Sequence, residues 1–174
     1  MKINITILYL TIISIYGYAV DYISGGMGVG SVRYPQNGIF TNQSVNHISA
    51  GLGFKIHQNA DTTTRLTVLA QGYTTASTLY LMDTGIKVFI IKSIFPKHYV
   101  SFGGVVTYAL SMSDRMDRLS SVGLGISMGY RYAVSTQLAV TIDACSHYYP
   151  RVFRDSWNMT ARSLTMGVTW DILP

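Results

Sequence analysis

The sequence predicts an all-β fold, an eight-stranded antiparallel up-and-down transmembrane β-barrel. Hydrophobic residues make up 48% of the chain and charged residues only 12%, about half the charge of an ordinary soluble domain. After residue 19, no segment is long and apolar enough for a transmembrane helix. Eight segments alternate between apolar and polar or small residues instead, and only helices and closed barrels satisfy every backbone group inside lipid. All eight acidic residues are Asp, so the chain lacks Glu, a favoured helix former.

The first nineteen residues differ in kind from the rest of the chain. Lys2 is their only charge, an apolar run follows over 3–15, and small residues stand at Gly17 and Ala19. This is the layout of a secretory signal peptide with a cut after Ala19. The alternative, an uncleaved membrane anchor, would need about 20 apolar residues. We therefore expect a cleavable signal over 1–19 and one outer-membrane barrel domain over 20–174.

The expected strands have the period of two of a segment that faces lipid on one side and a lumen on the other. In 45–57, Ile48 and Leu52 share one face, and His47 and Lys55 share the opposite face. The pattern is clear in five segments: 45–57, 98–112, 119–132, 137–149 and 161–172. It is fainter in three: glycine-rich 22–34, 64–75, and 83–95, where Phe89 and Ile91 interrupt the polar face. An even number of strands suits closure of an antiparallel barrel.

The connections between these segments also alternate. The short ones, 58–63, 96–97 and 133–136, are assigned to the periplasm. The others, 35–44, 76–82, 112–118 and 150–160, are longer on average and are assigned to the outside. Aromatic side chains are expected as girdles near both headgroup levels, with Phe54, Tyr130, Tyr132 and Trp170 towards the periplasm and Tyr108 and Tyr148 towards the outside.

The inward faces would gather charged and polar side chains in a narrow lumen. They are His47, Lys55, Arg65, Asp83, Lys87, Arg131, Asp143, His147 and Asp171. An eight-stranded barrel is just wide enough for side chains to fill, so internal ion pairs are expected and an open pore is not. Cys145 would join Asp143 and His147 on one strand face, which is a poor cage for a metal that usually wants four ligands. We expect neither a metal nor a cofactor.

Two stretches carry a resemblance to a known family. Ser121–Tyr132 followed by Gln137–Ala144 resembles the penultimate hairpin of small OmpA/OmpX-like outer-membrane barrels, and Ser163–Ile172 resembles their closing strand. The resemblance implies an assembly signal at Gly167, Trp170 and Ile172, to be read by the barrel-insertion machinery. Met166 stands where the family usually has a polar residue, and the chain runs on to Leu173 and Pro174. The family shares an architecture and has many functions.

Arginines cluster in the last two external connections. Lipopolysaccharide phosphates lie at that level, and arginine binds phosphate bidentately. Contact with lipopolysaccharide and a solvated loop are equally supported for Arg118, Arg151, Arg154 and Arg162.

Three functions fit these patterns, all without a nucleic-acid partner. The first is a non-enzymatic surface protein of the bacterial outer membrane, serving envelope structure, adhesion or binding of a host ligand through its external loops. The second is a lipid-modifying enzyme that acts on lipopolysaccharide, built from Ser146, His147, Asp155 and Ser156. Ser146 and His147 are neighbours on a strand and would face opposite ways, which disfavours this reading. The third is a secreted lipocalin-like barrel, which needs apolar residues inside.

Overall fold

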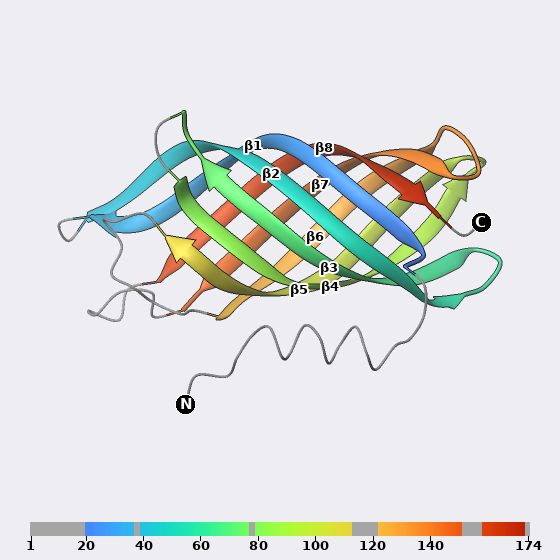
Figure 1. The fold of residues 1–174 in the computed structure, drawn as a ribbon, viewed down its shortest axis with the longest axis horizontal. Coiled ribbons are helices and arrows are strands. Elements are labelled where there is room, and N and C mark those ends of the chain that lie inside the picture. Colours follow the sequence, from blue (N-terminus) through green and yellow to red (C-terminus); the bar gives the residue numbers. More distant parts are fainter. Residues whose placement is uncertain (1–19, 37–38, 77–78, 113–121, 151–157, 173–174) are drawn as a thin grey trace.

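The computed structural model describes residues 20–36, 39–76, 79–112, 122–150 and 158–172. They form one closed barrel of eight strands, in which each strand pairs antiparallel with its neighbours in the sequence and β8 closes against β1 (Figure 1). The strands are β1 (Tyr22–Gln36), β2 (Ile39–Gln58), β3 (Thr62–Thr74), β4 (Leu79–Phe95), β5 (His98–Met112), β6 (Val122–Ala133), β7 (Leu138–Tyr149) and β8 (Met159–Asp171). Every predicted segment coincides with one strand, which confirms the fold class.

Within the described part of the chain, no helix has the length and apolarity needed to cross a membrane.

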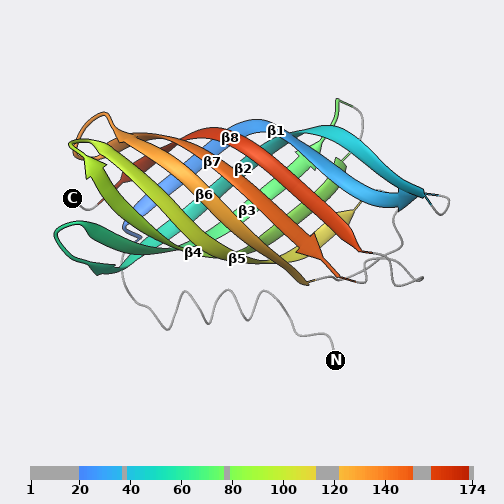
Figure 2. The same ribbon diagram turned by 180° about the vertical axis from the view of Figure 1, so that it is seen from behind.

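The two ends of the barrel are built differently (Figures 1 and 2). At one end, named here the turn end, lie the start of β1, the end of β8 and the short connections 59–61, 96–97 and 134–137. Two of these turns are closed by their own side chains. The Asn59 carboxamide oxygen accepts the N–H groups of Asp61 (3.1 Å) and Thr62 (2.8 Å), and the Ser135 hydroxyl accepts that of Leu138 (3.0 Å). The opposite end is the loop end.

The outer surface of the barrel is apolar through most of its height. Outward-facing side chains include Met27 (72% exposed), Phe102 (63%) and Met128 (64%). The six aromatic residues expected as girdles are half-buried or exposed on strand faces that point outward. Exposing so much apolar surface to water would be unfavourable, whereas contact of the same surface with lipid tails is favourable. We call this surface the apolar belt.

The alternation reverses at the loop end. On β1, Arg33 points outward while Val32 and Tyr34 are buried inside. On β8, Arg162 points outward while Met159 and Ala161 are buried inside. Water rather than lipid therefore surrounds the barrel here, since the ordinary rule of apolar residues inside applies again. The reversal marks the edge of the belt.

Two predicted external connections have wrong bounds. Residues 35–44 were expected to form an external loop, but β1 continues to Gln36 and β2 begins at Ile39, with Gln36 paired to Ile39. Polar residues such as Asn42 and Ser44 resemble loop residues, yet here they form the outward face of a ribbon in water. Similarly, β4 begins at Leu79, inside the predicted connection 76–82.

Candidate functional site

The structure brings all nine of the predicted lumen residues, Asp171 included, to the inside of the barrel or its turn-end mouth. His47, Arg65, Asp83 and His147 are buried there, while Lys55, Lys87, Arg131 and Asp143 are half-buried. They do not form one network. The inward-facing side chains form four layers, which follow one another from the turn end to the loop end.

The first layer, at the turn end, is an ion triad. Asp171 accepts two hydrogen bonds from the Arg65 guanidinium, at 2.8 and 3.2 Å, and one from Arg131 at 2.7 Å. The Arg65 guanidinium also lies over the Tyr22 ring, 4.5 Å from its centroid. The Tyr22 hydroxyl shares a hydrogen bond of 2.5 Å with Thr67. This triad separates an open mouth at the turn end from the cavity further inside, because Arg65 and Arg131 line both.

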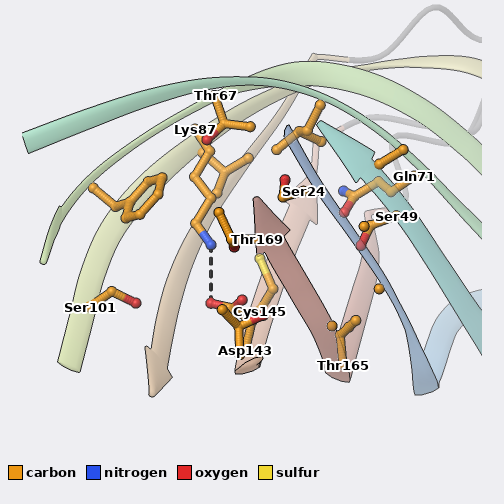
Figure 3. A pocket seen from close by; sticks show the side chains of 18 of the residues that line it. Ser24, Ser49, Thr67, Gln71, Lys87, Ser101, Asp143, Cys145, Thr165 and Thr169 are labelled. Carbon is orange, nitrogen blue, oxygen red and sulfur yellow. Dashed lines mark hydrogen bonds and ion pairs between the residues drawn. The ribbon is translucent and has the colours of Figure 1, made fainter. Parts of the chain in front are cut away.

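The second layer is a central cavity of about 120 Å³ (Figure 3). Lys87 reaches across it to Asp143, with the ammonium nitrogen 3.3 Å from the carboxylate. The other lining groups include hydroxyls of Ser24, Ser49, Ser101 and Thr165. A space of this size with several polar groups on its wall suits a few buried waters. Phe89 and Ile91, which interrupt the polar pattern of β4, also line it.

The third layer joins two histidines through hydrogen bonds. The His47 ring bonds to Thr165 (2.8 Å) and to Gln71 (3.3 Å). Gln71 continues to His147 (3.4 Å), whose other ring nitrogen meets the Tyr73 hydroxyl at 3.2 Å. Cys145 lies beside this layer, with its sulfur 3.4 Å from His147 Nε2. Among the described residues, no group of three side chains is placed to hold a metal ion.

The fourth layer closes the loop end of the lumen with packed apolar side chains. Its members are Val32, Tyr34, Val45, Tyr73, Leu81, Ala109, Tyr149, Met159 and Ala161. We call it the apolar plug. Asp83, fully buried beside it, accepts a hydrogen bond from the Tyr149 hydroxyl. Packed side chains therefore occupy the described lumen at both ends, the plug at the loop end and the triad at the turn end.

The predicted catalytic pieces are not brought together. Ser146 points to the outer face and His147 is buried in the lumen, so the two side chains lie on opposite sides of β7. Asp155 and Ser156 lie outside the described residues. A catalytic proposal needs mutual geometry first, and the described residues do not supply it for this set.

The remaining predicted site residues lie on the outer surface or at the seam of the barrel. Arg162 is exposed on the outer face of β8, while Arg118, Arg151 and Arg154 lie outside the described residues. Trp170 and Ile172 point outward at the turn end. Gly167 pairs with Gly26 of β1 at the seam that closes the barrel. A side chain at Gly167 would meet the backbone of Gly25 and Gly26, so the close approach of the two strands needs glycine there. Its role in assembly stays a prediction.

Sequence reasoning missed most of the apolar plug. Leu81, Met159 and Tyr149 were not assigned to the lumen, because a uniform polar interior was expected. The available signal was the phase of the alternation, since these residues continue the inward positions of Asp83, Ser163 and His147.

Comparison with models of protein families found no match, and neither did comparison with curated proteins. Solved structures do match. Neisserial surface protein A has a TM-score of 0.54 at 18% identity, over 87% of this chain and 97% of that chain. Ail, the attachment invasion locus protein of Yersinia pestis, has a TM-score of 0.46 at 13% identity, over 87% of this chain and 100% of that chain.

At these identities the likeness concerns the fold. Together with the apolar belt and the polar interior, the likeness to Neisserial surface protein A confirms the predicted architecture, and the belt excludes the lipocalin-like alternative, whose apolar residues would face inward. The chain has the fold of the small eight-stranded outer-membrane β-barrels, and it is a protein of the outer membrane.

Proposed function

We propose that this protein is a non-enzymatic surface protein, which acts in adhesion or binding of host molecules through its loop end. The observation that carries the proposal is the contrast between a closed lumen and an extended loop end. A packed plug and an ion triad fill the two ends of the lumen, which favours a role at the surface over transport. The surface beyond the belt is therefore the part that is free to act.

Among the described residues, that surface includes a two-stranded ribbon of β1 and β2. The pairing of β1 with β8 ends at Arg33 and Thr160, and that of β2 with β3 ends at Asn46 and Thr74. Beyond these pairs, β1 and β2 continue together to Gln36 and Ile39. The six residues from Ser31 to Gln36 extend about 17 Å along the strand.

The ribbon ends in exposed apolar side chains. Ile39 is 72% exposed and Phe40 is 44% exposed. Outward-facing Asn42, Ser44 and Asn46 separate this tip from the belt residue Ile48, so the tip is not part of the lipid-facing surface. Exposed apolar residues rimmed by polar ones are typical of interaction sites.

The test compares two matched pairs of residues at opposite ends of the barrel. Bacteria would display the protein with Ile39→Ser and Phe40→Ser, or with Ile94→Ser and Phe95→Ser at the turn end, where the native side chains are 44% and 67% exposed. Adherence to cultured epithelial cells is then counted, after heat-modifiable gel migration has shown equal folding. We expect the loop-end variant to lose most adherence and the turn-end variant to keep it. Equal adherence of both variants would contradict the proposal.

The lipid-modifying alternative has its own readout. Mass spectra of lipid A from cells with and without the protein should be identical if the protein is not an enzyme. A modified lipid A species that depends on the protein would overturn the non-enzymatic assignment.

A further inference from the structure

One row of residues crosses four strands at the loop-end edge of the belt. The ladders place Ser146 of β7 opposite Arg162 of β8, Arg162 opposite Ser31 of β1, and Ser31 opposite Ser44 of β2. All four side chains are on the outer face, where Arg162 and Ser44 are exposed. One step nearer the turn end, the same face of the first three strands carries Ala144, Leu164 and Val29. On β7, β8 and β1 the row is thus the first polar one above the belt, whereas on β2 the polar outer face already begins one step nearer the turn end, at Asn46.

A second arginine lies directly above this row. Arg33 pairs with Thr160, two residues from Arg162 on the same face of β8. Such diagonal neighbours are within reach of long side chains. Arg33 is exposed, and its guanidinium lies over the Phe40 ring, 4.5 Å from the centroid. This stacking limits the positions that the guanidinium can take.

No carboxylate of the described residues neutralises these two arginines. The three ion pairs of the described chain are all in the lumen. The five described aspartates, Asp21, Asp61, Asp83, Asp143 and Asp171, lie in the lumen or at the turn end. Arg33, Arg162 and the three serine hydroxyls therefore form an outward-facing cationic patch, which we call the collar patch.

We propose that the collar patch binds a phosphate group of lipid A, with Arg33 and Arg162 as the charged donors and Ser31, which lies directly beside Arg162, as the hydroxyl donor. Its height fits this ligand, because phosphates of lipid headgroups lie just above the hydrocarbon layer. Arginine binds phosphate through parallel charge-assisted hydrogen bonds. The choice of lipid A rests on the proposed function, which puts the loop end on the outside of the cell, where lipopolysaccharide forms the outer leaflet.

The experiment measures lipid binding by the full-length mature protein refolded in detergent. The probes are lipid A with both phosphates, dephosphorylated lipid A, and phosphatidylglycerol, each titrated in mixed micelles. The variants are Arg33→Gln, Arg162→Gln and the double variant. Lys92→Gln is the matched control, because Lys92 is an exposed cation on the outer face of β4 near the turn end. Gel migration before and after heating shows that each variant is folded.

We expect each arginine substitution to weaken binding of lipid A about five- to tenfold, the range for losing a charge-assisted hydrogen bond at an open surface. Lys92→Gln should leave binding unchanged, and dephosphorylated lipid A should bind weakly to every form. The proposal is overturned if the double variant binds lipid A like the parent, or if phosphatidylglycerol shows the same binding and the same losses. Because micelles impose no orientation, this result is independent of whether the loop end faces outward in cells, which adherence tests separately.

Discussion

The loop end and the turn end of this barrel place apolar and charged side chains on opposite sides of the barrel wall. At the loop end, apolar side chains point inward and arginines outward, as in a water-soluble protein. At the turn end, Arg65, Arg131 and Asp171 point inward while Trp170 and Ile172 point outward. The difference shows where lipid ends. One strand can carry both arrangements because side chains alternate at every step and only the surroundings change.

The contrast also separates two ways of stabilising a narrow lumen. The plug stabilises the folded barrel through burial of apolar surface and close packing. The triad stabilises the folded barrel only while each of its charges is paired, because an unpaired buried charge is destabilising. Substitutions at the two ends should therefore lower the free energy of unfolding for different physical reasons.

The largest effect is expected at the turn end. Asp171→Ala leaves the buried Arg65 and half-buried Arg131 guanidinium groups without their shared carboxylate, which should lower the free energy of unfolding by about 3–5 kcal/mol. Urea titration of the protein in lipid vesicles measures this. Asp61→Ala, at the same end but exposed and outside the triad, is the control and should change stability little. A loss below about 1 kcal/mol for Asp171→Ala would show that the triad is not important for stability.

The loop end should respond through packing. Leu81 is fully buried in the plug, so Leu81→Ala should cost about 2–5 kcal/mol by leaving a cavity. Its neighbour Met82 points outward to the surface, and Met82→Ala should cost much less because the surroundings can fill the space. Equal losses for the two substitutions, in the same urea titration, would argue against a packed plug.

A smaller effect is expected where Tyr22 covers Gly53. A side chain at Gly53 would overlap the Tyr22 ring, whereas a side chain at Gly104 would meet no atom within 4 Å. Gly53→Ala should therefore cost about 1–3 kcal/mol by overpacking. Gly104→Ala should be neutral or slightly stabilising. The reverse order of stabilities would mean that the Tyr22 ring does not lie against Gly53.

The smallest effect belongs to the central cavity. Lys87 and Asp143 are 3.3 Å apart, and their side chains are 16% and 32% exposed. Solvent in the cavity screens such a pair, so Lys87→Gln should cost no more than about 1 kcal/mol. A loss as large as that of Asp171→Ala would mean that the cavity is drier than its lining suggests.

Much of the fold follows from the sequence because one rule, alternation across a lipid boundary, covers most of the chain. It gave the eight strands and the inward direction of residues such as Arg65 and Lys87. It failed for 35–44, because the rule holds only inside lipid. Asn42 and Ser44 look like loop residues until the pairing with β1 is known.

The sequence alone could not show which distant side chains become neighbours once the strands are paired. Asp171 was expected in the lumen, but nothing in the pattern joined it to both Arg65 and Arg131, which lie 106 and 40 residues away. The collar patch was missed for the same reason. Arg33 and Arg162 become neighbours only when β8 closes against β1, and the closing register is a long-range property.

The assignment of the loop end to the outside of the cell can be measured directly. Cys145→Ser removes the only native thiol, and Ile39→Cys or Lys97→Cys then places one thiol at the loop end or at the turn end. A membrane-impermeant maleimide should label Ile39→Cys in intact cells and Lys97→Cys only after the outer membrane is opened. Labelling of Lys97→Cys in intact cells, with Ile39→Cys protected, would contradict the proposed orientation and the surface function that depends on it.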